Sequence, residues 1–160
     1  MNSVLYRSAS GVSSFQSELF NNETFYAAFL NDLRMCREVA IIESPFITLR
    51  RLRVLLPIFS QLTSRGVRVS VNTRNPREED NAFWSREAQI AIDLLQRTGV
   101  TVLYTVGHHR KLAIIDDQIL WEGSLNILSQ HDSCEIMRRI TSEQEATRMK
   151  DFINVTQFLD

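Results

Sequence analysis

One short stretch of the sequence combines residue types that can attack and stabilise a phosphate ester. Six residues form the pattern H-x-K-x4-D-x6-G-S-x-N, namely His109, Lys111, Asp116, Gly123, Ser124 and Asn126. At ordinary residue frequencies this coincidence arises by chance on the order of once in 10⁵ to 10⁶ sequences of this length. Histidine supplies a nucleophile or an acid, and the lysine, serine and asparagine supply hydrogen-bond donors. We therefore interpret the stretch as a site for a phosphate diester.

The spacing of these residues predicts that their side chains converge. Successive side chains on a strand point to opposite faces, so His109 and Lys111 project together while Arg110 points away. Residues 116–118 separate two apolar, β-prone runs and predict a hairpin turn. That turn returns residues 123–126 to the level of His109, where the glycine allows close backbone approach. Such a cluster can stabilise an oxyanion, and neither a metal ion nor a cofactor is expected.

Helical and strand-like segments alternate along the rest of the chain. The expected strands are the apolar or β-branched runs at 4–6, 39–42, 67–71, 101–104, 111–115, 119–121 and 135–140. The expected helices begin after an N-cap at Asn22, at Leu49, at Ala82, and at a capping box formed by Ser142 and Glu145. Pro57 lies inside the second helical pattern and predicts a kink or a restart there.

This order of segments predicts an α/β layered fold with a mixed central sheet. We expect one domain over residues 1–160, in which residues 1–20 form an N-terminal arm or edge strand. The pattern is equally compatible with a chain that is part of a larger protein.

The composition limits the partners that the chain can attract. Lysine and arginine total 18 against 19 acidic residues, so any anion-binding surface must be a local patch. Arg74 and Arg77 follow an expected strand, where ligands often bind in α/β folds, and with Arg110 they are candidate substrate contacts. Two cysteines, no signal-peptide pattern and no apolar run of about 20 residues predict a cytoplasmic chain that does not enter a membrane.

The six-residue pattern resembles the HKD motif of the phospholipase D superfamily. The resemblance extends to Glu135, because that family carries an acidic residue about ten positions beyond its asparagine. The α/β layout upstream is similar to one HKD repeat, so the resemblance spans most of residues 20–160. It implies a phospholipase D-like layered α-β-α domain with one HKD repeat per chain.

The resemblance also implies a mechanism. One histidine attacks phosphorus to form a covalent phosphohistidine, and a second histidine protonates the leaving oxygen and then activates water. Lys111 and Asn126 would hold the non-bridging oxygens, with Ser124 adding its hydroxyl to the same site. Glu135 would orient a histidine. The aspartate at the turn and the glycine of the motif are expected to serve local structure.

This chemistry needs two histidines on opposite sides of one phosphate, whereas the chain carries one motif. With its one motif, the chain is similar to the short bacterial endonucleases of this family, which pair two chains about a two-fold axis. The resemblance therefore implies a homodimer in which both copies of His109 share one site. It implies nucleic acid as the substrate, with DNA favoured over RNA. Strandedness, endonuclease or exonuclease action, sequence specificity and the product ends stay open.

Other interpretations stand beside this one. The chain could be a lipid phosphodiesterase or phosphatidyl transferase, or a non-catalytic nucleic-acid-binding domain of a restriction, repair or helicase protein. Four residues could form a zinc site, although their spacing matches no established pattern: His108, His109, His131 and Cys134. His108 is otherwise expected at the surface or behind His109. Trp84 and Trp121 fit either the core or an interface.

Overall fold

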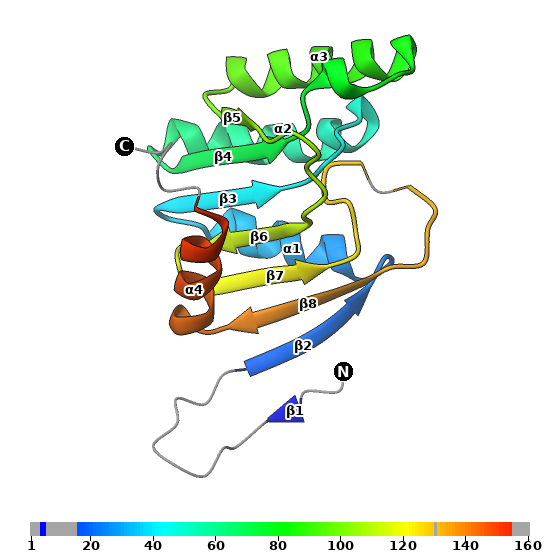
Figure 1. Ribbon diagram of the computed structural model, residues 1–160. Helices are drawn as coiled ribbons and strands as arrows, with labels where there is room; N and C mark the ends of the chain where they lie inside the picture. The colour runs from blue at the N-terminus through cyan, green and yellow to red at the C-terminus, as the bar shows by residue number, and fades with distance from the viewer. Residues whose placement is uncertain (1–3, 6–15, 130, 155–160) are drawn as a thin grey trace.

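Eight strands form one mixed sheet in the computed structural model, in the order β1-β2-β8-β7-β6-β3-β4-β5 (Figure 1). The structure describes residues 4–5, 16–129 and 131–154. The strands are β1 (Val4–Leu5), β2 (Gln16–Asn21), β3 (Val39–Glu43), β4 (Arg68–Thr73), β5 (Thr101–Tyr104), β6 (Leu112–Ile115), β7 (Ile119–Gly123) and β8 (Ile136–Thr141). The helices are α1 (Phe25–Met35), α2 (Leu49–Ser64), α3 (Ala82–Arg97) and α4 (Glu143–Ile153), with a 3-10 turn, η1 (Pro76–Glu78).

The register of the sheet places several strand ends along one edge. Strands β3, β4 and β5 run parallel, whereas β6, β7 and β8 are paired in antiparallel fashion. Leu112 lies opposite both Glu43 and Glu122, and Gly123 lies opposite Met137. The carboxyl ends of the parallel strands therefore share one edge with the start of β6, the end of β7 and the start of β8. We call this the carboxyl edge.

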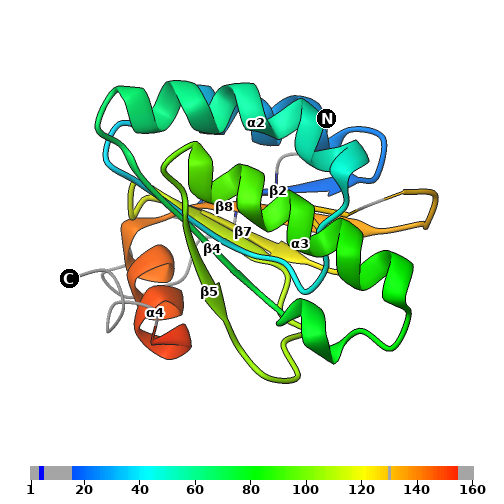
Figure 2. The same cartoon turned by 90° about the horizontal axis from the view of Figure 1, so that it is seen from above.

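Helices cover both faces of the sheet. Apolar residues of α1, α2 and α3 pack in one large core that includes Ile42 and Trp121. On the other face, α4 contributes Ala146 and Ile153 to a smaller core with Ile41. Figure 2 shows α4 on the side of the sheet opposite α2. Because β3 is covered on both faces, all five of its residues are buried, as the apolar run over its first four residues indicates.

The layered α/β fold and the mixed sheet expected from the sequence are confirmed, with three local differences. Strand β2 overlaps the segment over residues 1–20 that was expected to be an arm or edge strand. Its residues are mostly polar, and pairing with β8 holds it in the sheet. The N-cap of α1 is Thr24 instead of Asn22. Helix α2 continues through Pro57, so a restart there is wrong. Pro57 is exposed, which lets solvent satisfy the carbonyl that a proline cannot bind.

Within the described residues, no helix combines the length and the apolar character needed to cross a membrane.

Candidate active site

Most of the residues that the sequence singles out meet at the carboxyl edge. His109, Lys111 and Ser124 line an open hollow of about 1040 Å³. The segment from His109 to Lys111 precedes β6 instead of belonging to it, and the hairpin brings the end of β7 alongside. The Gly123 N–H donates to the Lys111 carbonyl at 3.3 Å, so the hairpin returns the chain to the level that the spacing predicts.

Lys111 holds the exposed ring of His109. Its Nζ lies 2.9 Å from His109 Nδ1 and 2.8 Å from the His109 carbonyl oxygen. An ammonium group can only donate, so Nδ1 is the acceptor in this contact. Partial burial lowers the pKa of Lys111, and the negative charge of Glu135 opposes that shift. The arrangement leaves a cation beside a histidine at an open surface, as binding of an anionic ester requires.

Arg110 also lines the hollow, and its guanidinium pairs with Glu43. Its Nε lies 2.5 Å from Glu43 Oε2, and its Nη2 donates to Oε1 at 3.1 Å. Asn72 Nδ2 donates to the same Oε1 at 3.1 Å. Burial raises the pKa of the fully buried Glu43, while Asn72 and Arg110 favour the carboxylate. The charge of Arg110 is therefore balanced by Glu43 in the lining of the hollow, and its contact with substrate stays a prediction.

Ser124, directly after β7, meets Glu135, directly before β8. Ser124 Oγ donates to one Glu135 oxygen and accepts the Ile136 N–H at 3.1 Å. Ser133 Oγ donates to the other Glu135 oxygen at 2.6 Å. These two hydroxyl contacts hold the pKa of Glu135 below its ordinary value, so the group is ionised at neutral pH. Within the described part of one chain, no hydrogen bond joins Glu135 to His109.

Gly123 is needed for the close approach of β7 and β8. A methyl group at this position would lie 2.1 Å from the Ile136 carbonyl oxygen and 2.9 Å from Met137 Cα. Both are backbone atoms of the paired strand, so they cannot move without disturbing the sheet.

Gly123→Ala is expected to lower the free energy of unfolding by about 2 kcal/mol or more, because the added methyl overpacks a backbone contact. The measurement is urea denaturation of the variant beside the wild-type chain. The same variant should displace Ser124, whose N–H donates to the Ile136 carbonyl at 2.9 Å. An unchanged midpoint and slope would contradict this account.

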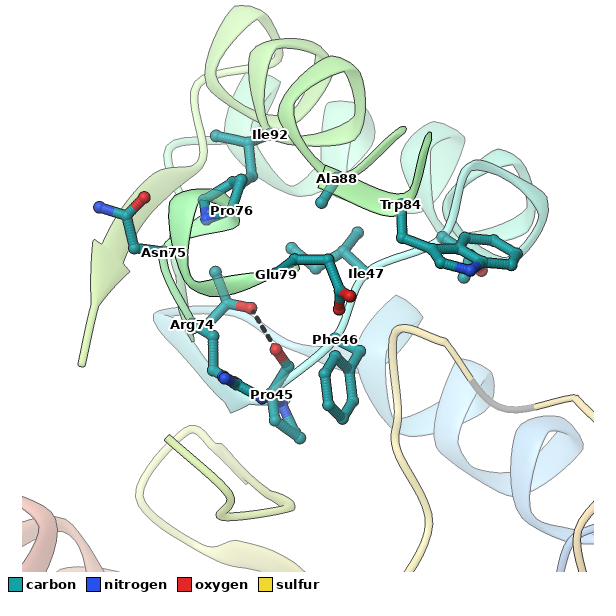
Figure 3. Close-up of a pocket in the computed structure, with 12 residues that line it drawn as sticks. Pro45, Phe46, Ile47, Arg74, Asn75, Pro76, Glu79, Trp84, Ala88 and Ile92 are labelled. Carbon is teal, nitrogen blue, oxygen red and sulfur yellow. Dashed lines mark hydrogen bonds between the residues drawn. The ribbon is translucent and has the colours of Figure 1, made fainter. Parts of the chain in front are cut away.

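Asn126, Arg74 and Arg77 lie outside the hollow. Asn126 follows β7, and its buried Oδ1 has no hydrogen-bond partner in the structure as described. Arg77 is exposed on η1. Arg74 lines a different pocket on the same edge of the sheet (Figure 3). The structure thus brings His109, Lys111, Ser124 and the Glu135 carboxylate to one region, while Asn126 does not reach them by a hydrogen bond within the described residues.

Asp116 lies at the opposite end of β6 from His109. It starts the β6–β7 turn, where both it and Asp117 have a φ of 52°. Its carboxylate accepts the backbone N–H groups of residues 37–39 at 2.9, 2.8 and 3.1 Å. This motif aspartate therefore ties the hairpin to the turn between α1 and β3.

His108, which precedes His109 in the sequence, is a buried histidine. It is 3% exposed, so the expectation of a surface position is wrong. Burial lowers its pKa to about 4, and the positive charges of Arg110 and Lys111 add to the effect, whereas Glu78 opposes it. His108 is accordingly neutral at pH 7.

Protonation of His108 should make the chain less stable in mild acid. The unfolded chain takes up this proton near pH 6.5 and the folded chain only near pH 4. Above pH 6.5 both states are neutral; below it the unfolded state binds more protons, so the free energy of unfolding falls by about 3 kcal/mol down to pH 4. His108→Gln should remove this part of the slope in urea denaturation between pH 6.5 and pH 4. Equal slopes for variant and wild type would exclude His108 as the cause.

Two acidic residues that the sequence interpretation overlooks hold the His109 segment in place. Glu43 binds Arg110, and Glu78 Oε2 accepts the Gly107 N–H at 2.9 Å. A charged residue that ends an otherwise apolar strand, as Glu43 does, was a signal available in the sequence. In the part of the chain that the structure describes, no three His, Cys, Asp or Glu side chains form a group that could hold a metal ion. The zinc alternative has no such geometry, since Cys134 is exposed and His131 pairs with Asp132.

Comparison with known proteins relates this arrangement to a family. A family model described as cardiolipin synthase, PLD-like domain, matches residues 29–155. NucT from Helicobacter pylori has a TM-score of 0.69 at 19% identity, over 86% of this chain and 92% of NucT. Nuc from Salmonella typhimurium, a phospholipase D family member, has a TM-score of 0.69 at 14% identity, over 86% of this chain and 91% of Nuc.

A larger protein shares the fold over part of its length. Phosphatidylserine synthase from Haemophilus influenzae Rd KW20 has a TM-score of 0.63 at 13% identity, over 88% of this chain and 38% of the synthase. Comparison with curated protein sequences finds no match. The structural likenesses, at these identities, show the fold. The family model spans most of the sequence, and the chain therefore belongs to the PLD-like family within the phospholipase D superfamily of phosphodiesterases.

Proposed function

We propose that the chain is a metal-independent phosphodiesterase that cleaves nucleic acid, DNA in preference to RNA, through a covalent phosphohistidine. The observation that carries this proposal is the contact of Lys111 Nζ with His109 Nδ1 at the open hollow. The single motif, which resembles that of the short bacterial endonucleases, supports nucleic acid as the substrate, and the fold likeness to NucT and Nuc spans nearly the whole length of each.

His109 is the proposed nucleophile and acts through Nε2 once the ring carries its proton on Nδ1, the atom that Lys111 contacts in the free protein. When substrate binds, the Lys111 ammonium moves to a non-bridging phosphate oxygen, which allows the ring to carry its proton on Nδ1. Nε2 then forms the bond to phosphorus as the bond to the leaving oxygen breaks, and a second imidazolium gives that oxygen a proton. Water, which gives its proton to the second imidazole, attacks the phosphohistidine and releases the phosphomonoester and His109.

The second histidine is proposed to be His109 of another copy of the chain in a homodimer. Leu19, Ile136 and Phe152 line the hollow and are 64%, 63% and 82% exposed, an unusual density of large apolar groups around a polar site. An isologous interface across this surface would bury them and place two copies of His109 about one two-fold axis. It would also offer Glu135 a histidine to orient, a contact that the described part of one chain does not make.

Lipid phosphodiester cleavage is the second candidate. The same exposed apolar groups could meet acyl chains, and phosphatidylserine synthase shares the fold. The two candidates differ in the substrate that supports turnover, so one experiment separates them.

Cleavage assays test the proposal directly. The chain is incubated in excess EDTA with end-labelled single- and double-stranded DNA, with RNA, and with phosphatidylglycerol vesicles. We expect cleavage of DNA and an acid-labile, alkali-stable phosphate on the protein. Turnover of vesicles alone would favour the lipid candidate, binding of DNA without turnover would favour a non-catalytic domain, and a strict need for divalent metal would exclude the mechanism.

A further inference from the structure

A second pocket opens at the carboxyl edge, between the segments that follow β3 and β4 and the first turns of α3 (Figure 3). It encloses about 270 Å³, and most of its lining is apolar. Phe46, Pro76 and Ile92 form part of the wall, with the half-exposed Trp84 at the mouth. A volume below about 300 Å³ suits a single small ring system better than a larger ligand.

Two acidic residues connect this pocket to the His109 segment. Phe46 follows Glu43 by three residues, so at most about 10 Å of extended chain separates it from the carboxylate that holds Arg110. Glu78 accepts the Asn75 N–H in the pocket wall at 3.2 Å and the Gly107 N–H at 2.9 Å. Glu78 therefore links the pocket wall to the segment that carries His109 through two hydrogen bonds.

Each polar group of the pocket matches a different part of a nucleotide. The Arg74 guanidinium lies over the Phe46 ring at 5.5 Å from its centroid, and its contact with Glu78 is a long one of 3.8 Å. Its buried Nε has no hydrogen-bond partner in the described structure. Glu79, another lining residue, accepts the Asn81 N–H through one oxygen at 3.2 Å. The pocket thus combines flat apolar walls with a cation and an acceptor.

We propose that this pocket takes one unpaired nucleobase of the substrate, next to Phe46 and Trp84, while Arg74 contacts the adjacent phosphate. The inference rests on the proposed nucleic-acid substrate and deepens it. Aromatic and proline faces stack on any base, and the carboxylate of Glu79 can accept from an exocyclic amine. An acyl chain would gain nothing from the guanidinium and the carboxylate. A base can enter only when it is unpaired, so single strands or frayed ends are the preferred substrate.

A double-mutant cycle between pocket and bases tests this inference. Binding is measured by fluorescence anisotropy in the His109→Ala background, with a single-stranded DNA of about 12 nucleotides and an all-abasic strand of the same length. Phe46→Ala and Trp84→Ala are each expected to weaken binding of the base-bearing strand on the order of 10-fold, and to leave binding of the abasic strand unchanged. Tyr104→Ala is the matched control, because Tyr104 is an aromatic residue that is 45% exposed and outside the pocket lining, whereas the Phe83 ring packs against Trp84.

The outcomes separate this inference from the proposed function. Equal weakening on both strands, equal weakening by Tyr104→Ala, or no weakening would overturn the base pocket. Trp84 is 50% exposed, so its variant tests the pocket even where Phe46→Ala disturbs folding. If the wild-type chain binds DNA in a base-dependent way but does not cleave it, the pocket is supported and the nuclease function is refuted. If the chain cleaves DNA and the pocket variants cleave it equally well, the nuclease function is supported and the pocket is refuted.

Discussion

Replacing His109 with asparagine is expected to lower phosphodiesterase turnover by at least about 10⁴-fold, because no covalent intermediate can then form. The His109 ring is exposed and its hydrogen bond goes to Lys111, so the variant should keep its fold. Single-turnover cleavage of labelled DNA measures the loss, and circular dichroism checks the fold. His131→Asn is the matched control, since His131 is exposed and does not line the hollow. Turnover within about 10-fold of wild type would remove His109 from the mechanism.

Mixed dimers show whether two copies of His109 serve one site. Wild-type and His109→Asn chains are mixed in equal amounts and allowed to exchange subunits. If one phosphate needs both histidines, only the pure wild-type dimers are active, and activity falls to about one quarter of that of the same total of wild-type chains. Independent sites would leave about one half. A monomeric chain with full turnover would refute the dimer.

Asp116→Asn is expected to lower the free energy of unfolding by about 3 kcal/mol without changing turnover per folded molecule. The carboxylate accepts three backbone N–H groups and the Cys36 thiol, and an amide would present a donor to some of them. Asparagine tolerates the positive φ at this position, so the turn itself should survive. Asp116 stands at the sheet edge opposite His109, which is why chemistry at the hollow should not sense the change. Urea denaturation and DNA cleavage measure the two effects.

Protonation of Asp116 in acid should lower the free energy of unfolding in the same way as Asp116→Asn does. Burial raises the pKa of Asp116, but the backbone N–H groups of Glu38, Arg37 and Val39 outweigh it and hold the pKa below 3.8. The stabilisation is therefore complete above pH 3.8 and is lost as the pH falls through the lower, folded-state pKa. Asp117→Asn is the control: it removes only the partly exposed pair with Lys150 and should cost about 1 kcal/mol or less. Equal losses for the two variants would contradict the special role of Asp116.

Local patterns predicted the parts of the fold that depend on near neighbours. The apolar run at β3, the Ser142 cap of α4 and the hairpin around residues 116–118 each follow from a few adjacent residues, and each is present. Strand β2 could not be found in this way, because its mostly polar residues form a strand only through pairing with β8, more than 100 residues away. Pro57 shows the converse: tertiary packing of α2 outweighs a local helix breaker.

In the candidate site, too, some features follow from adjacent residues and others only from tertiary packing. Residue types and spacing alone were enough to select His109 and Lys111 and to indicate phosphodiester chemistry, because a two-residue offset on an extended segment puts both side chains together. Tertiary packing determined the partner of each charged or polar group. It buried Glu43 against Arg110, joined Ser124 to Glu135 and left Asn126 apart from them.

The sequence by itself determined the layered α/β class, the hairpin and the proximity of His109 and Lys111, since these depend on the character of residues within a few positions of one another. The tertiary structure alone showed that Asp116 works at the far edge of the sheet and that Glu43 and Glu78 hold the His109 segment. It alone brought Phe46, Arg74 and Trp84 around one pocket. Those relations join residues from separate strands and helices, and only the pairing of the sheet brings their side chains within contact distance.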